Sequence, residues 1–220
     1  MRLTESAYSF IIEDFFGPGV IAGFTKPALS GHLPQDVQTA LCDRAVSAPV
    51  AYLKQIHSSA IQVIEQDGMY VGDGLFTSCA HLALVVKTAD CLPILLYSQD
   101  LGAAGVVHMG WRSACLGILD TIPFELGSFK AVAGVGLREC CFRVTEEFFN
   151  YLQFIPFLMR SGNGLFFDAA GFARSRLVKH GLKRENFFDN RICSYCNPGG
   201  FFSHRRGDTS SRTLSFIMKS

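Results

Sequence analysis

The segment LALVVKTADCLPILLYSQDLGAAGVVHMGWR, from Leu82 to Arg112, has the clearest pattern in this 220-residue chain. Residues 82–86, 92–97 and 103–107 form three runs that are almost entirely apolar. Runs without polar alternation predict strands that are covered on both faces. Between the first two runs, Lys87–Cys91 is too polar to be buried without partners, so we expect it at the end of a strand.

Helices are expected to flank these strands. One should begin after Gly110 and carry along one side Trp111, Ala114, Cys115, Ile118 and Leu119. Thr145 predicts the N-cap of a helix that runs through Met159. Asp168 and Gly181 predict the N-cap and the C′ position of another helix, which ends at residue 180.

The remaining pattern completes the predicted fold class. Further elements are expected as a helix at 35–46, a strand pair at 8–24, and strands at 51–56, 60–65, 130–137, 187–193 and 213–218. Strands and helices that follow one another in this way indicate helices packed over a sheet. We therefore predict a single domain over residues 1–220, of the α/β (α+β) class, with a mixed β-sheet core and flanking helices.

Composition and charge argue against several classes of protein. With a formal net charge of +1, the chain has no broad basic surface for nucleic acid or an anionic membrane. The longest apolar stretch, residues 82–97, is interrupted by Lys87, Asp90 and Pro93 and is not expected to span a bilayer. No targeting segment is visible, so we expect a cytoplasmic protein whose eight cysteines are thiols or metal ligands. The oligomeric state is open from the sequence, and a monomer is expected.

Three residues of metal-ligand type stand at expected strand ends: His57, Cys91 and His108. Two imidazoles and a thiolate match the donors that zinc prefers, and three protein ligands leave a fourth position open, as in catalytic zinc sites. Other interpretations use the same residues. Strand-end histidines are commonly hydrogen-bonded and lone cysteines commonly pack as small apolar groups, while Cys91 could be a nucleophile with His108 as its general base. The spacing leaves these interpretations open.

Five motifs together identify a resemblance to a known family. In chain order they are Gln55-Ile-His57-Ser58, Asp73-Gly74, Thr88-Ala-Asp-Cys-Leu-Pro93, His108-Met-Gly-Trp-Arg112 and Phe201-Phe-Ser-His-Arg-Arg206. From about Tyr52 to the C-terminus, the chain resembles the laccase-domain family, long called multi-copper polyphenol oxidoreductases and now regarded as zinc-dependent purine nucleoside phosphorylases. The specific part is an apolar strand that ends in Thr-Ala-Asp-Cys and is followed by His-x-Gly-Trp-Arg.

The resemblance implies a zinc ion held by His57, Cys91 and His108. It implies phosphorolysis of adenosine, inosine and S-methyl-5′-thioadenosine, so that a purine nucleoside and phosphate are the substrates, with adenosine deamination as a further activity. The family fold is similar to the catalytic domain of cytotoxic necrotizing factors, which are toxins with a Cys/His deamidase site. A Cys91/His108 amidase or deamidase therefore stays open as an alternative.

Copper chemistry fits this sequence poorly. A laccase-like polyphenol oxidase needs a trinuclear copper cluster with many more histidines than the six of this chain. Zinc is the expected ion, and copper is the less expected one. A non-catalytic zinc-binding protein is a further alternative, because residues 24–31 show no clear counterpart of the N-terminal segment that is usual in the family.

Phosphorolysis requires cationic groups that bind a phosphate dianion. Arg112, at an expected strand-to-helix turn, is the first candidate for contact with phosphate or substrate, helped by the helix N-terminus. Arg205 and Arg206 are the second candidates, although a solvated basic turn would have the same local sequence.

Carboxyl and amide groups near the ligand residues complete the expected site. Asp73 and Asp90 could orient the histidine ligands or act as acid–base groups. Asp73 lies between two glycines and could equally be a turn residue. Gln55 could contact the substrate or zinc-bound water, or it could be a simple exposed residue at a strand end.

Four other cysteines have a less regular pattern. Cys193-Ser-Tyr-Cys196 is a C-x-x-C pair, but no second pair follows at zinc-ribbon spacing. Cys140 and Cys141 could complete a structural metal site with it. We instead expect the four to form part of the wall of the active-site pocket, because the family tends to have cysteines at these places.

Ser113 stands where the family usually has glycine after Trp-Arg.

Overall fold

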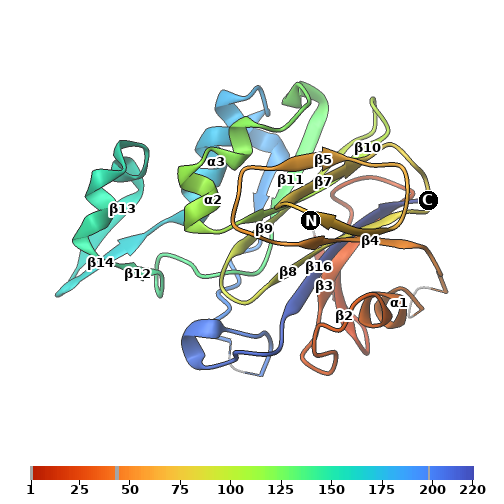
Figure 1. Cartoon of the computed structure of the whole chain (residues 1–220), viewed down its shortest axis with the longest axis horizontal. Coiled ribbons are helices and arrows are strands. Elements are labelled where there is room, and N and C mark those ends of the chain that lie inside the picture. The colour runs from red at the N-terminus through yellow and green to blue at the C-terminus, as the bar shows by residue number, and fades with distance from the viewer. Residues whose placement is uncertain (1, 43–44, 198) are drawn as a thin grey trace.

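The apolar runs of the sequence form inner strands of two β-sheets that are stacked on one another (Figure 1). The computed structural model describes residues 2–42, 45–197 and 199–220. In spatial order, the first sheet contains β1 (Arg2–Glu5), β2 (Ser9–Glu13), β3 (Val20–Thr25), β16 (Thr213–Lys219), β8 (Ala83–Thr88), β4 (Val50–Lys54) and β6 (Gly68–Val71). The second sheet contains β15 (Phe187–Asp189), β11 (Phe129–Ala133), β9 (Leu92–Ser98), β10 (Ala103–Met109), β7 (Gly74–Thr77) and β5 (Ile61–Val63).

One apolar layer lies between the two sheets. Leu84 and Val86 of β8 belong to the same buried cluster as Leu95 of β9 and Val106 of β10. The alternate residues of these strands point to the outer faces, and they are buried as well. The prediction that the three apolar runs are covered on both faces is therefore confirmed.

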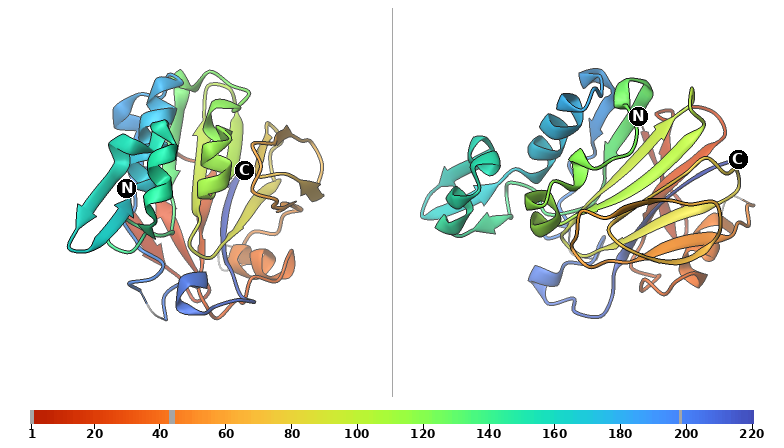
Figure 2. Two further views of the ribbon diagram at one scale, coloured as in Figure 1. Left: turned by 60° about the vertical axis from the view of Figure 1, so that its left-hand side comes forward. Right: turned by 45° about the horizontal axis from the view of Figure 1, so that its top comes forward.

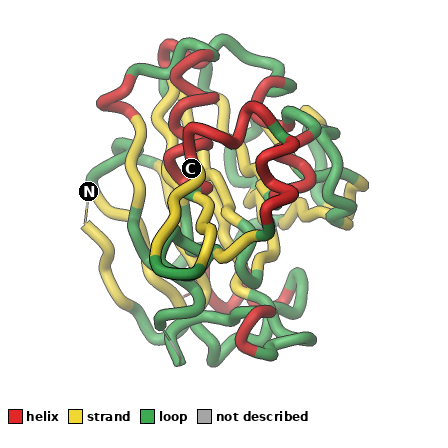
Figure 3. The backbone as a smooth tube through the Cα atoms, turned by 90° about the vertical axis from the view of Figure 1, so that its left-hand side faces the viewer, coloured by secondary structure: helices red, strands yellow, loops and turns green. Residues whose placement is uncertain are grey.

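Helices cover the outer face of each sheet. α1 (Gln35–Cys42) covers the first sheet through Val37, Ala40 and Leu41. α2 (Trp111–Cys115) and α3 (Ala169–Lys179) lie on the opposite side of the molecule, over the second sheet (Figure 2). The tube in Figure 3 is otherwise mostly strand and loop. The predicted α/β class with flanking helices is confirmed, and the structure has stacked sheets in place of one core sheet. A single domain over residues 1–220 stays a prediction.

The chain passes from the first sheet to the second at one common edge. β4, β6 and β8 are parallel to one another, so their carboxyl ends lie together. Each is followed by a strand of the second sheet, namely β5, β7 and β9 respectively. β10 runs antiparallel to β7 and β9, so it ends where they begin. The turns at this edge therefore bring together residues that are far apart in the sequence.

The caps of α3 agree with the sequence. The Asp168 carboxylate accepts a hydrogen bond from the backbone N–H of Gly171 at 2.8 Å. At the other end, Gly181 has φ +95°, and the backbone N–H groups of Gly181 and Leu182 donate to the carbonyls of Val178 and Leu177. This pair of bonds is the Schellman arrangement, which requires a left-handed residue that glycine adopts without strain. The prediction of this helix and of both caps is confirmed.

The helix predicted from Thr145 to Met159 is wrong. This segment forms two 3₁₀ helices, Glu146–Asn150 and Leu152–Phe157, and the side chain of Thr145 makes no capping hydrogen bond. Pro156 cannot donate a backbone hydrogen bond, and its ring would clash with the preceding turn of an α-helix.

The end of the predicted helix, Leu158 and Met159, belongs to a strand in the structure. β13 (Leu158–Ser161) pairs with β14 (Gly164–Phe167), which also pairs with β12 (Arg143–Val144). This small third sheet projects from one end of the molecule (Figures 1 and 2).

Several other boundaries differ from the predicted ones. α1 ends at Cys42 within the described residues, 43–44 lie outside them, and the structure is not helical at Val46. β11 and β15 are shorter than predicted. Beyond β11, the backbone N–H groups of Gly134 and Leu137 donate to the carbonyls of Pro93 and Asp90 in place of continuing a strand. Further 3₁₀ turns lie at Ile118–Asp120, Leu126–Ser128, Arg184–Asn186 and His204–Arg206.

Within the described residues, no helix is both long enough and apolar enough to cross a membrane.

Candidate functional site

His57, Asp73, Cys91 and His108 meet at the edge where the chain changes sheets. His57 follows β4, Asp73 lies between β6 and β7, Cys91 lies between β8 and β9, and His108 is near the end of β10. His108 has the same parity along β10 as Ala104 and Val106, whose side chains lie in the apolar layer between the sheets. Its imidazole is therefore directed to the mouth of that layer.

Asp73 connects the two histidines. Its carboxylate accepts hydrogen bonds from Nδ1 of His108 at 2.8 Å and from the backbone N–H groups of His57 at 3.0 Å and Ser58 at 2.6 Å. The Ser58 hydroxyl donates to it at 2.7 Å. Asp73 is fully buried and His108 is 3% exposed. With Nδ1 of His108 held in this way, Nε2 is the nitrogen that remains for a ligand or a proton.

Two residues of the site have left-handed backbone conformations. His57 has φ +56° and Asp90 has φ +91°, values that non-glycine residues rarely adopt. Each is held by surrounding contacts: the backbone N–H of His57 donates to Asp73, and the Asp90 carboxylate accepts from Ser194 Oγ at 2.8 Å and from the backbone N–H of Arg205 at 2.7 Å. Strained residues of this kind are concentrated at functional sites.

The three predicted metal ligands converge. One potential ligand atom from each of His57, Cys91 and His108 lies within 4.8 Å of the other two. The imidazole centroids of the two histidines are 4.9 Å apart. Two imidazole nitrogens and a thiolate are the donors that zinc prefers. A carboxylate that accepts a hydrogen bond from the second ring nitrogen, as Asp73 does from His108, is a common partner of a metal-bound histidine. The residues present fit a zinc ion.

Gly110 allows this close approach. A Cβ atom at position 110 would lie 2.8 Å from Nδ1 of His57 and 3.2 Å from Sγ of Cys91. Ser113, in the first turn of α2, holds the Gly110 backbone, because its hydroxyl accepts a hydrogen bond from the Gly110 N–H at 2.9 Å. The serine that departs from the family pattern thus closes the turn with its own side chain.

The electrostatics of the site favour a cation. Burial alone would lower the pKa of His108, but hydrogen bonds and charges from Asp73 and Cys91 raise it to about 9. Burial lowers the pKa of His57, and the positive charges of His108 and Arg112 lower it further against the opposing effect of Asp73. Burial alone would raise the pKa of Asp73, but its hydrogen bonds to His108 and Ser58 lower it to about 2. A buried carboxylate thus lies next to the potential ligands, where it stabilises positive charge.

A cavity of about 1000 Å³ opens over the three ligand residues. Five cationic residues line it: Lys54, Lys87, Arg112, Arg205 and Arg212. His204 and Ser210 also line it, whereas none of the residues 24–31 does. A cavity with three arginines beside a potential metal site can bind an anion such as phosphate.

Arg112 lies in this lining and is exposed. Its guanidinium lies 4.6 Å from the centre of the Trp111 ring. Among the described residues, no hydrogen-bond acceptor is found for it, so its donors point to no protein partner. α2 has only five residues, so the helix dipole expected to assist Arg112 is small.

The structure separates the other two predicted arginines. Arg205 lines the cavity, and its Nη1 donates to the carbonyl of Cys141 at 2.8 Å. Arg206 is outside the lining: its guanidinium donates to the carbonyls of Ser194 and Tyr195 and to the Asp208 carboxylate. The Arg206 side chain therefore holds its own loop together.

Gln55 and Asp90 line the cavity, but their polar atoms have protein partners. The Gln55 amide donates to the carbonyl of Lys87 at 2.7 Å and accepts from the Lys87 N–H at 2.8 Å, so it joins the ends of β4 and β8. The Asp90 carboxylate accepts hydrogen bonds from Ser194 and Arg205, and within the described part of the chain it bonds to neither His57 nor His108. Both side chains are placed to fix the shape of the cavity wall.

Three cationic residues that line this cavity, Lys54, Lys87 and Arg212, were not among the predicted site residues. Arg212 immediately precedes β16, which runs antiparallel to β8 and therefore starts at the same edge. Lys54 and Lys87 are at the ends of β4 and β8. Their positions at strand ends were visible in the sequence, but the order of the strands, which brings these ends together, was not.

The four other cysteines do not line this cavity, contrary to the prediction. Cys140 and Cys141 line a neighbouring hollow of about 860 Å³, together with Arg205 and Glu146.

Several known proteins are similar to this chain in sequence or in structure. A purine nucleoside phosphorylase of Borreliella burgdorferi is 31% identical over 177 residues, which cover 73% of this chain and 75% of the relative. A protein named adenosine deaminase RL5, from an unknown prokaryotic organism, is 29% identical over 177 residues, covering 73% of this chain and 67% of the relative. The crystal structure of YlmD from Geobacillus stearothermophilus has a TM-score of 0.88 over 99% of this chain and 98% of that chain, at 21% identity, and shows the fold.

The family whose description is multi-copper polyphenol oxidoreductase laccase matches residues 34–220, which is most of the chain. The resemblance inferred from the five motifs is thereby confirmed. This chain belongs to the multi-copper polyphenol oxidoreductase laccase family, whose members similar to it include proteins named purine nucleoside phosphorylase.

Proposed function

We propose that this protein is a zinc-dependent purine nucleoside phosphorylase that acts on adenosine, inosine and S-methyl-5′-thioadenosine, with adenosine deamination as a second activity. One observation carries the proposal: potential ligand atoms of His57, Cys91 and His108 converge beside a cavity lined by three arginines. The names of similar proteins support both activities. Cytoplasmic location and a monomeric state stay predictions.

His57, Cys91 and His108 would hold the metal ion. Zinc bound by them would supply a Lewis acid in the wall of the cavity. Asp73 keeps the His108 ring in one orientation and one tautomer through the hydrogen bond to Nδ1. Its further bonds to His57 and Ser58 hold the loop after β4, so one carboxylate positions two of the three ligands.

Arg112, Arg205 and Arg212 would bind phosphate. In phosphorolysis, an oxygen of phosphate attacks the anomeric carbon of the ribose as the bond to the purine nitrogen breaks, which gives ribose 1-phosphate and a base that takes up a proton. Guanidinium groups bind phosphate oxygens through paired, charge-assisted hydrogen bonds. We assign Asp90 and Gln55 positioning roles, because Asp90 fixes the backbone of Arg205 and Gln55 fixes that of Lys87.

The proposal is tested by metal analysis and turnover of the purified protein. We expect zinc at the site and production of adenine and ribose 1-phosphate from adenosine and phosphate. His57→Ala should lose this zinc and the activity, whereas His32→Ala, which changes an exposed histidine outside the cavity, should retain both. Protein that is loaded with zinc and yields no ribose 1-phosphate would remove the phosphorylase proposal.

A second candidate is a cysteine hydrolase, either an amidase or a deamidase. It is favoured by one observation: Cys91 and His108 have potential ligand atoms within 4.8 Å of one another, and His108 is in turn held by Asp73. A thiol, an imidazole and a carboxylate in this order can form a nucleophile, a base and an orienting group. Metal-free protein that hydrolyses amides and is inactivated by alkylation of Cys91 would favour this candidate. Activity that disappears with the metal would exclude it.

A further inference from the structure

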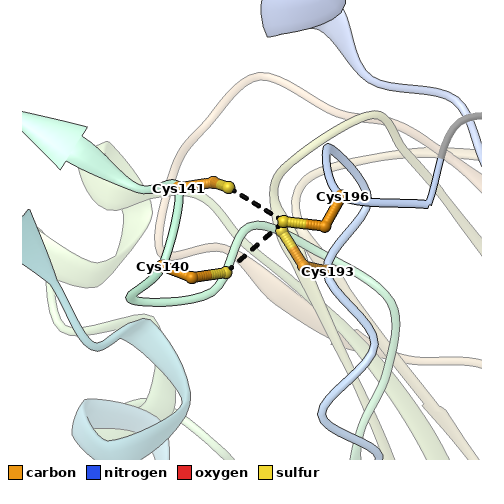
Figure 4. A group of neighbouring side chains, drawn as sticks. All are labelled: Cys140, Cys141, Cys193 and Cys196. Carbon is orange, nitrogen blue, oxygen red and sulfur yellow. Dashed lines mark hydrogen bonds between the residues drawn. The ribbon is translucent and has the colours of Figure 1, made fainter.

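Four cysteines that the proposed function does not use converge in a second place. Cys140 and Cys141 lie in a turn after β11, and Cys193 and Cys196 lie in a turn after β15. The two turns face each other, and all four side chains point into the space between them (Figure 4). Their sulfur atoms all lie within 4.8 Å of one another.

Apolar packing does not account for this arrangement. Cys140 and Cys196 are exposed, Cys141 is intermediate, and only Cys193 is buried. Cysteines that merely fill a core are among the most buried residues of a protein. Convergence of four thiols, three of which solvent reaches, therefore indicates that the sulfur atoms themselves have a function.

The sulfur–sulfur distances suit a metal ion. Sγ of Cys196 is 3.7 Å from Sγ of Cys140 and 3.1 Å from Sγ of Cys141. A disulfide has its sulfurs at about 2.05 Å. Four thiolates arranged tetrahedrally around zinc, with Zn–S bonds of about 2.3 Å, have their sulfurs about 3.8 Å apart. The Cys140–Cys196 pair already has this separation, and the Cys141–Cys196 pair would need to move apart by less than an ångström.

Four thiolates whose sulfur atoms lie within 4.8 Å of one another would repel each other strongly. A divalent cation would remove the mutual repulsion that four thiolates have in its absence.

We propose that Cys140, Cys141, Cys193 and Cys196 form a second, structural zinc site, separate from the site of His57, Cys91 and His108. Binding releases the thiol protons to solvent and forms four Zn–S bonds, so no oxidant or reductant is needed. A closed set of four thiolates is characteristic of structural zinc and leaves no position open for a substrate.

The second site is hydrogen-bonded to two residues that line the active-site cavity, Asp90 and Arg205. Arg205 donates to the carbonyl of Cys141, and Ser194, inside the C-x-x-C turn, donates to the Asp90 carboxylate. The Arg205 backbone N–H donates to the same carboxylate. Zinc at the four cysteines would therefore hold Arg205 in the cavity wall through contacts that are already present.

The number of zinc ions in the whole protein tests the proposal. We expect two zinc ions per chain in the wild type, one in Cys91→Ser and one in Cys193→Ser/Cys196→Ser. The matched control, Cys42→Ser, changes an exposed cysteine at the end of α1 and should keep two. One zinc in the wild type that is lost in Cys91→Ser would overturn the second site and leave the first intact.

X-ray absorption provides a measurement that does not require the cluster to be mutated. In Cys91→Ser, the remaining zinc should have four sulfur neighbours at about 2.3 Å. Nitrogen or oxygen neighbours would overturn the assignment. A disulfide between Cys141 and Cys196 is the competing outcome, and it is detected by counting thiols through alkylation of wild-type protein unfolded without reductant. The zinc site predicts eight alkylated thiols, the number of cysteines in the sequence. Six alkylated thiols would indicate the disulfide and overturn the zinc site.

Discussion

At the scale of single residues, Gly110 shows how tightly the metal-ligand group is built. Its backbone has φ −83°, which any residue adopts, so a glycine is required here only for space. The missing side chain leaves room for the His57 imidazole and the Cys91 sulfur, both within 3.2 Å of where a Cβ would lie. Atoms in well-packed surroundings yield poorly to an added methyl group.

Gly110→Ala should therefore weaken metal binding without removing any ligand. Overpacking of this kind costs about 1–3 kcal/mol, so we expect zinc affinity to fall about ten- to a hundredfold. Titration against a chelator of known affinity measures this. Gly127→Ala is the matched control, because its Cβ would meet nothing closer than 4.0 Å. Equal zinc affinity in both variants would contradict the close approach at Gly110.

Arg112→Ala tests the role of a guanidinium that has no hydrogen-bond acceptor among the described residues. Loss of a charge-assisted hydrogen bond to phosphate removes about 1.5–3 kcal/mol, so we expect kcat/KM for phosphate to fall about ten- to a hundredfold. The zinc content should be unchanged. The control Arg174→Ala removes an exposed arginine of α3, outside the cavity. An unchanged phosphate dependence in Arg112→Ala would assign phosphate binding to Arg205 and Arg212 alone.

Residue types were predicted better than residue contacts. His57, Cys91 and His108 could be named as candidate ligands because residues that bind zinc are chemically few, and the structure brings these three together. The placing of Gln55 on the Lys87 backbone and of Arg206 in its own loop could not be predicted, because both depend on which backbone groups are nearby after folding. For the four other cysteines, a common metal site was considered from the sequence, but their expected place in the wall of the active-site cavity was wrong for the same reason.

At the scale of elements, α3 shows where local sequence is sufficient. Asp168 caps the first turn and Gly181 ends the helix, and both signals depend on residues within one turn of the helix end. The segment from 145 to 159 carries a similar N-terminal signal but contains Pro156 and a strand that pairs with β14. Pairing with a distant strand is a tertiary effect, and it overrides local helix preference.

Asp168→Ala should destabilise the protein through the end of α3. The change removes the acceptor of the Gly171 N–H and costs about 1 kcal/mol. Asp168→Asn retains an oxygen acceptor and should cost much less. Urea unfolding followed by circular dichroism gives both values, with zinc content held equal because a bound ion adds its own stability. Equal losses in the two variants would show that the charge, and not the cap, stabilises this helix.

At the scale of the whole molecule, the stacking of two sheets creates the site. β4, β6 and β8 each end at the edge where the chain passes to the second sheet, so the residues after them are neighbours only when both sheets are formed. The sequence indicated buried strands but not their division between two sheets, because the burial pattern of a strand does not identify its neighbour. The site is therefore a product of the tertiary fold, and its integrity depends on the layer between the sheets.

Leu95→Ala tests this layer directly. Leu95 is fully buried in β9, within the cluster that the two sheets share, and its register partners are Val106 and Val132. Removing its side chain leaves a cavity and should lower the free energy of unfolding by about 2–5 kcal/mol. Leu152→Ala is the matched control, because Leu152 is 77% exposed and its loss should change stability by less than about 0.5 kcal/mol.

Because the ligand residues are held at the edge of the same layer, zinc affinity should fall in Leu95→Ala and stay unchanged in Leu152→Ala. A destabilised Leu95→Ala protein that binds zinc as tightly as the wild type would show that the loops hold the site without support from the sheets.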